Sequence, residues 1–136
     1  MPKKTPKTKA LDTLQKLVRL KAADEHGYCT CVSCGKIDKW SSFDGGHFIP
    51  KGYSSYWALR EENVHPQCKG CNGFGMRHGT AMSRYTVWMQ NMYGKDIVDD
   101  METMKRTQVK FYKKDYEEMT KDWNEQIKFH LKRIGE

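Results

Sequence analysis

The sequence contains two Cys-x-x-Cys pairs, Cys31-Val32-Ser33-Cys34 and Cys68-Lys69-Gly70-Cys71. Two residues between cysteines let one tight turn present both thiolates to the same ion, and Gly35 suits such a turn. We therefore predict a structural Zn²⁺ site with the four ligands Cys31, Cys34, Cys68 and Cys71. Cys29 is left over, because Cys29-Thr30-Cys31 is a poor zinc turn, and we predict that it is a free thiol.

The segment between the two pairs is longer than the spacing of about 15–20 residues found in zinc ribbons. It contains Gly46-His47-Phe48-Ile49-Pro50, and it ends in Glu61-Glu62-Asn63-Val64-His65-Pro66-Gln67-Cys68. Asn72 follows directly after the second pair, at Cys71-Asn72. The length and content of this segment indicate that it carries a function besides zinc binding.

In this order, the three motifs resemble the HNH, or ββα-metal, nucleases. They are most similar to the phage NinG/Rap recombination nucleases and more loosely similar to phage endonuclease VII. The resemblance covers about residues 28–94. It implies a metal-dependent endonuclease that hydrolyses phosphodiesters of branched DNA or recombination intermediates, such as a Holliday junction or a D-loop, leaving 5′-phosphate and 3′-hydroxyl ends.

The resemblance also implies roles for single residues. His47 would be the general base that deprotonates water, a task that suits an imidazole with a pKa near neutrality. Asn63 would brace the loop that carries His47. Asn72 would bind the catalytic Mg²⁺ or Mn²⁺ through its amide oxygen, which suits a hard cation.

The sequence departs from the family at Gly46, where these nucleases usually have an aspartate that binds the catalytic metal. Asp44 lies on the same face of an extended strand as Gly46, so it is the first candidate for the missing ligand, and His65 is the second. Several alternatives stay open. Asp44 could stabilise a turn instead of binding the metal, and His65 could be a core histidine. Alternatively, His47 could itself bind the metal while another group acts as the base.

The charge distribution favours a nucleic-acid partner. The chain has 136 residues, a formal net charge of +7, 38% hydrophobic and 30% charged residues. Most of the excess positive charge lies before residue 22, which fits contact with a phosphate backbone, although a solubilising tail is the alternative. We predict DNA contacts at ten basic residues: Lys3, Lys4, Lys7, Lys9, Lys16, Arg19, Lys51, Arg60, Lys69 and Arg77. Tyr56 and Trp57 could stack on bases or belong to the core.

Composition also restricts where in the cell the protein is expected. No apolar run approaches the roughly 18 residues of a transmembrane helix, and the basic N-terminus has no apolar segment after it. We expect a cytoplasmic protein, in the host cell if a phage encodes it. A reducing compartment favours metal binding over disulfides for the five cysteines.

The pattern of apolar residues predicts an α+β fold that is mostly helical. We expect a disordered basic arm (1–8), a zinc-stabilised nuclease core with an N-terminal helix (9–94) and a helical C-terminal extension (95–136). The expected helices run from Thr8 or Lys9 to His26, from Ala81 to Tyr93, from Asp96 to about Arg106 and from Val109 to Ile134. Gly27 and Gly94 would end the first two helices. Extended segments are expected near Trp40–Ile49 and just before Asn63.

The sequence leaves open the role of the last helix and the function of the protein. The apolar stripe of the last helix could pack on its own domain or form the seam of a homodimer. The protein could also be a non-catalytic zinc module that binds DNA or protein, or an HNH nuclease that acts on ordinary duplex DNA.

Overall fold

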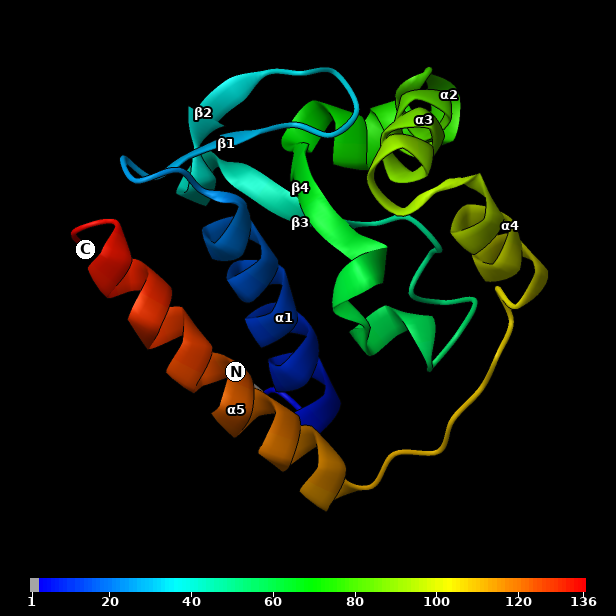
Figure 1. Cartoon of the computed structure of the whole chain (residues 1–136). Coiled ribbons are helices and arrows are strands. Elements are labelled where there is room, and N and C mark those ends of the chain that lie inside the picture. Colours follow the sequence, from blue (N-terminus) through cyan, green and yellow to red (C-terminus); the bar gives the residue numbers. More distant parts are fainter. Residues whose placement is uncertain (1–2) are drawn as a thin grey trace.

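A computed structural model of the chain describes residues 3–136 (Figure 1). The fold is α+β and mostly helical, as predicted, with two small antiparallel sheets of two strands each. Within the described residues, no helix is both long enough and apolar enough to cross a membrane.

The first helix, α1, spans Pro6–Ala22 and begins earlier than predicted. The Thr5 hydroxyl accepts a hydrogen bond from the Thr8 amide (3.1 Å), and Pro6 occupies the first helical turn, where its missing N–H costs nothing. The segment before α1 is therefore shorter than the predicted basic arm (1–8), and the first two residues of that arm lie outside the described chain. The predicted end at Gly27 is wrong: α1 ends at Ala22, and Gly27 (φ 84°) belongs to the turn that follows.

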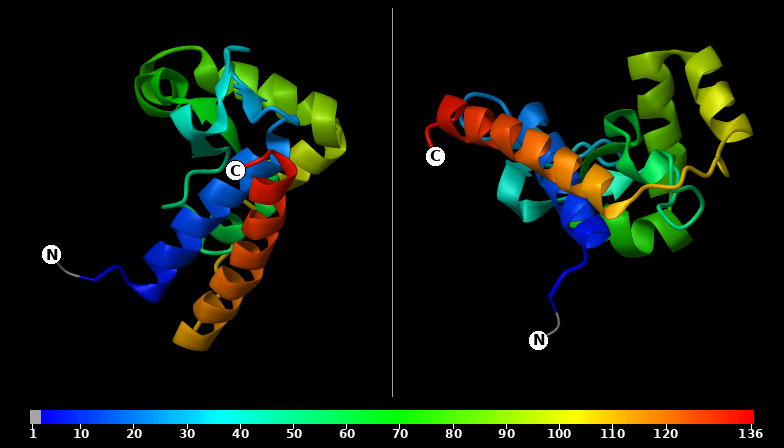
Figure 2. Two further views of the ribbon diagram at one scale, coloured as in Figure 1. Left: turned by 90° about the vertical axis from the view of Figure 1, so that its left-hand side faces the viewer. Right: turned by 90° about the horizontal axis from the view of Figure 1, so that it is seen from below.

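The last helix, α5, spans Lys113–Arg133 and lies alongside α1 (Figures 1 and 2). Its buried residues Trp123 and Ile127 join the core that α1 forms with Leu14 and Leu17. Arg133 donates hydrogen bonds to the carbonyl oxygens of Leu20 and Ala23 (2.9 and 3.0 Å), which satisfies the C-terminal end of α1. The apolar stripe of α5 thus packs within its own chain.

Two hairpins lie between these helices in sequence. Strands β1 (Tyr28–Thr30) and β2 (Ile37–Lys39) form the first, and β3 (Phe43–His47) and β4 (Val64–Cys68) form the second. Short 3₁₀ turns occupy Trp40–Ser42, Trp57–Leu59 and Glu61–Asn63. The second strand was expected before Asn63, but it begins immediately after that residue.

The chain after β4 forms a helical layer. A π-helical turn, η4 (Cys71–Gly75), continues into α2 (Met76–His78), and α3 (Ala81–Tyr93) and α4 (Lys95–Thr103) follow. The predicted bounds of α3 are confirmed, and Gly94 ends it with φ 92°. A second buried cluster joins this layer to the segment after β3 and includes Phe48, Ile49, Trp57, Tyr85, Met89, Val98 and Met101.

Residues 104–112, which we call the strap, connect α4 to α5 without forming a helix: 104–106 make a turn, and 107–112 have no regular secondary structure (Figure 1). Backbone groups of the strap bond to the segment after β3: Ser55 Oγ donates to the Val109 carbonyl (2.9 Å) and accepts from the Val109 amide (2.7 Å). The Trp57 indole donates to the Met104 carbonyl (3.0 Å). The prediction that the last helix begins at Val109 is therefore wrong, because these contacts hold the strap in a non-helical path.

The approach of β3 to α1 yields a stability prediction. A Cβ on Gly45 would lie 2.8 Å from the Cα of Gln15, whereas a Cβ on Gly52 would meet nothing within 4 Å. We expect Gly45→Ala to lower the free energy of unfolding by about 1–3 kcal/mol through overpacking, and Gly52→Ala to change it by less than about 0.5 kcal/mol. Urea denaturation followed by circular dichroism measures both, and equal midpoints would contradict the close approach of β3 to α1.

Candidate functional site

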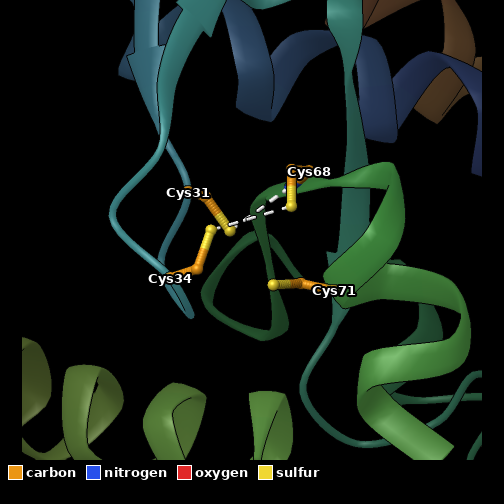
Figure 3. Close-up of side chains that lie close together, drawn as sticks. All are labelled: Cys31, Cys34, Cys68 and Cys71. Carbon is orange, nitrogen blue, oxygen red and sulfur yellow. Dashed lines mark hydrogen bonds between the residues drawn. The ribbon is translucent and has the colours of Figure 1, made fainter. Parts of the chain in front are cut away.

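The four cysteine sulfurs converge as predicted (Figure 3). Cys31 and Cys34 come from the turn between β1 and β2, whereas Cys68 ends β4 and Cys71 begins η4. All four Sγ atoms lie within 4.8 Å of one another, and those of Cys34 and Cys68 are 3.8 Å apart. Tetrahedral Zn²⁺ with Zn–S bonds of about 2.3 Å would hold its sulfurs about 3.8 Å apart. The cluster therefore fits a metal ion such as zinc.

The electrostatics of the cluster also favour a metal. Burial alone would raise the pKa of Cys31, but backbone amides, including that of Cys68 (3.3 Å), bond to its sulfur and lower the pKa to about 7. Burial and the neighbouring thiols raise the pKa of Cys71. A cation at the centre would offset the cost of burying the Cys71 thiolate and its repulsion by neighbouring thiolates. Cys29 lies apart, and its thiol bonds to the Arg19 carbonyl (3.0 Å).

A second group of polar side chains lies on β3 and η4. The Asn72 amide donates to one carboxylate oxygen of Asp44 (3.1 Å), and the Lys69 ammonium donates to the other (2.8 Å). Partial burial would raise the pKa of Asp44, but the hydrogen bonds from Lys69 and Asn72 outweigh it, so the pKa falls below its usual value. The structure thus brings together an ionised carboxylate and an amide, two of the predicted ligands for the catalytic metal.

His47 lies at the end of β3 and borders the same hollow as Asp44 and Asn72, a space of about 870 Å³. Its Nε2 lies 2.9 Å from the Ala58 carbonyl oxygen, which can only accept, so Nε2 carries the proton. Burial is the main reason why the pKa of His47 lies below its usual value, and the charge of Lys51 lowers it further. The ring is therefore neutral at neutral pH, and Nδ1 holds a lone pair.

Asn63 braces the segment that follows His47. Its fully buried amide accepts a hydrogen bond from the Ile49 amide (2.8 Å) and donates to the Ile49 and Trp57 carbonyls (2.9 and 3.1 Å). The Phe48 amide also donates to the Asn63 carbonyl (2.9 Å). These hydrogen bonds tie Ile49 and Trp57 together, so Asn63 fastens the segment that begins directly after His47.

His65 lies away from the hollow, in a pocket of aromatic rings. Tyr85 donates its proton to the Gly46 carbonyl (2.7 Å), so it must accept from His65 Nδ1 (3.0 Å). His65 Nε2 then accepts from the Tyr93 hydroxyl (2.8 Å). Burial lowers the pKa of His65 to about 4. Both ring nitrogens are occupied, which favours the alternative that His65 is a core histidine over the expectation that it binds metal.

Gly46 has no room for a side chain. A Cβ there would lie 1.8 Å from Gln67 Oε1 and 3.1 Å from Asn72 Oδ1. An aspartate could therefore not occupy position 46 while Gln67 keeps its place. The Gln67 side chain thus fills the space that a side chain at position 46 would need.

Comparison with known proteins supports part of the predicted family. Residues 2–133 match the family described as bacteriophage lambda NinG protein. The chain belongs to the NinG family. The match extends over nearly the whole chain, well beyond the region 28–94 in which the motifs had shown the resemblance. No curated protein and no solved structure matches this chain.

The predicted DNA-binding residues occupy several environments in this NinG-family fold. Lys51 and Arg77 border the hollow with His47, and Lys69 pairs with Asp44. Lys4 pairs with Asp12 (2.6 Å), and Arg60 pairs with Glu62 (2.9 Å). Lys3, Lys7 and Lys9 are exposed near the start of α1, and Lys16 is half-buried on that helix.

Arg19 does not fit its predicted role. Its half-buried guanidinium donates to the Phe43 carbonyl (3.0 Å) and the Trp40 carbonyl (3.4 Å), so it ties α1 to the start of β3. Trp57 is buried and so belongs to the core, while Tyr56 packs against it. Two further residues had no role in the sequence-based prediction: Gln67, which is fully buried directly before Cys68, and Lys105, which borders the hollow.

The cysteine cluster yields a test of metal binding. We expect Cys34→Ser to lose most of the zinc that the purified wild-type chain carries, because three thiolates hold the ion less well than four. Cys29→Ser is the matched control, since that thiol lies outside the cluster, and it should keep the wild-type zinc content. Elemental analysis of the dialysed proteins measures both. Zinc that survives in Cys34→Ser but not in Cys29→Ser would show that the ligand set is wrong.

Proposed function

We propose that this NinG-family chain is a metal-dependent DNA endonuclease, with His47 as the general base. The observation that carries the proposal is the convergence of Asp44, His47 and Asn72 on one hollow. Each of these side chains has the protonation state or donor type that phosphodiester hydrolysis needs.

His47 is prepared for proton abstraction. The Ala58 carbonyl fixes the ring with its proton on Nε2, and within residues 3–136 no hydrogen bond engages Nδ1. A neutral imidazole with a free Nδ1 can take a proton from a water molecule as that water attacks a phosphorus atom. Asn63 holds the following segment, so the ring position does not depend on a loose loop.

Asp44 and Asn72 would hold the catalytic Mg²⁺ or Mn²⁺. The Asn72 amide nitrogen donates to an Asp44 carboxylate oxygen (3.1 Å), so a half-turn of the amide would bring its oxygen beside that carboxylate. Carboxylate and amide oxygens suit this hard cation. Bound there, the ion would neutralise charge that develops on the scissile phosphate and the leaving 3′ oxygen.

The order of elements supports the HNH, or ββα-metal, assignment. Strands β3 and β4 are antiparallel, and the helical segment η4–α2 follows directly. The proposed base lies on the first strand of this unit and one metal ligand begins its helix. Asp44, two residues before Gly46, takes the place of the usual aspartate as the carboxylate ligand.

DNA is the proposed substrate because cations border the hollow. Lys51 and Arg77 form no ion pair with the described residues, and both border the hollow, so they could bind the phosphates of a strand that enters it. The preference for branched DNA rests on the resemblance to the NinG/Rap nucleases. A homodimer could cut two strands of a junction, but it would have to use a surface other than the packed stripe of α5.

A substrate panel tests the proposal. We expect the wild-type chain to cut a four-way junction, a flap or a D-loop in the presence of Mg²⁺ or Mn²⁺, and His47→Ala to cut at least about 10²-fold more slowly. His26→Ala, which changes an exposed histidine distant from the hollow, should keep the wild-type rate. Gel analysis of end-labelled DNA measures the rates.

The panel also separates the competing functions. Equal cutting by wild type and His47→Ala, or no metal-dependent cutting of any DNA, would favour a non-catalytic zinc module. Equal rates on linear duplex and on branched DNA would favour an HNH nuclease with an ordinary duplex substrate.

The low pKa of His47 predicts the acid side of the pH–rate profile. The base works only when neutral, so the rate should fall as the pH drops through a pKa that lies below the usual histidine value of about 6.5. Lys51→Gln removes a positive charge that lowers this pKa, so it should move the fall to higher pH. Single-turnover rates between pH 5 and 8 measure the shift, and a profile that Lys51→Gln leaves in place would argue against His47 as the titrating base.

A further inference from the structure

Gln67 is a fully buried polar residue whose amide orientation is fixed by its neighbours. The Ser33 hydroxyl donates its proton to the Ala81 carbonyl (2.8 Å), so Ser33 Oγ can only accept from Gln67. The Gln67 Nε2 atom therefore faces Ser33 (2.9 Å), and Oε1 must face the other way.

Gln67 Oε1 is buried and has no hydrogen-bond partner within residues 3–136. Leaving such an oxygen unpaired destabilises the fold, so it calls for a physical reason. Gln67 pairs directly with Asp44 in the β3–β4 ladder, which puts the two side chains on the same face of the sheet. Both Gln67 Oε1 and Asn72 Oδ1 border the space that Gly46 leaves open.

The Asn72 amide has the wrong orientation for a metal when it bonds to Asp44. Its nitrogen bonds to the carboxylate (3.1 Å), while its oxygen, like Gln67 Oε1, lies against the space at Gly46. A half-turn of the amide exchanges the two atoms. It then presents oxygen beside the Asp44 carboxylate, as a cation requires, and presents N–H toward Gln67 Oε1, which has no donor among residues 3–136.

We propose that Gln67 is a positioning residue that stabilises the metal-binding orientation of Asn72, by accepting a hydrogen bond from the turned amide. The proposal rests on the proposed function, because it concerns the same catalytic metal. Gln67 does not itself border the hollow, so it acts through Asn72 and not as a ligand. The missing side chain at Gly46 is what lets Gln67 reach this position.

Lys69 also takes part in the change between the two orientations of the Asn72 amide. Its ammonium bonds to Asp44 (2.8 Å) and is well exposed, so it can leave when a divalent cation arrives. Without a metal, the Asn72 N–H and Lys69 both satisfy the carboxylate. With a metal, the carboxylate binds the cation, and the freed Asn72 N–H turns to Gln67.

The test measures Mn²⁺ binding to the zinc-loaded full-length chain by isothermal titration calorimetry and by the electron paramagnetic resonance of free Mn²⁺. We expect Gln67→Met to weaken Mn²⁺ binding about tenfold, because it removes the acceptor and keeps the volume. Gln126→Met is the matched control. It makes the same substitution on α5, away from the hollow, and its affinity should stay within about threefold of wild type.

Two further variants separate positioning from a general effect on folding. Gln67→Glu keeps an acceptor oxygen and should bind Mn²⁺ at least as tightly as wild type. In an Asn72→Asp background both side-chain oxygens are equivalent and no amide needs orienting. The tenfold effect of Gln67→Met should therefore vanish there. Zinc content and the thermal unfolding midpoint show which variants are folded.

The outcomes are distinct. Mn²⁺ binding and DNA cleavage by wild type, with equal Mn²⁺ affinity in Gln67→Met, would overturn the positioning role and leave the nuclease proposal standing. The same tenfold loss in the Asn72→Asp background would also overturn it, since the effect would then not pass through the amide. A wild-type chain that neither binds Mn²⁺ nor cuts DNA would overturn both proposals.

Discussion

The antiparallel pairing of β3 with β4 is the constraint on which the rest of the site depends. It pairs Asp44 with Gln67 and Gly46 with His65. A slip of one residue would turn every side chain of one strand to the opposite face. The cysteine cluster opposes such a slip, because Cys68 ends β4, its amide bonds to Cys31, and Cys71 begins the turn that carries Asn72. A structural metal held by the four cysteines would thus fix the distance between Asp44 and Asn72, the two proposed ligands of the catalytic metal.

The parts of the fold that local chemistry determines could be predicted from the sequence. The spacing of the cysteines required all four to meet, and Gly94 has the positive φ that ends α3. Elements that depend on distant partners were misplaced. The apolar pattern from Val109 onward resembles a helix, but Ser55 holds the strap in a non-helical path through two hydrogen bonds that no local pattern contains.

In the candidate site, too, features set by the local sequence were predictable, and features set by distant residues were not. Strand alternation correctly put Asp44 and Gly46 on one face, and Asn72 lies where the spacing from the cysteines suggested. Alternation also puts His65 and Gln67 on that face, but it does not show which of the two lies beside Asn72. The difference comes from what covers each residue: Tyr85 and Tyr93 close over the histidine, whereas Ser33 orients the glutamine toward Asn72. Such neighbours come from α3 and from the first cysteine turn, far away in the sequence.

The packing of α1 against α5 has a consequence for how this protein is made. The first and last helices bury their apolar faces on each other, and α1 also supports β3. A contact between such distant segments forms late, because the chain between them must first be closed into a loop. During synthesis α1 has no partner until α5 leaves the ribosome. A nascent chain would therefore have β3, which carries Asp44 and His47, on an α1 whose other apolar contacts are still unmade until α5 has been synthesised.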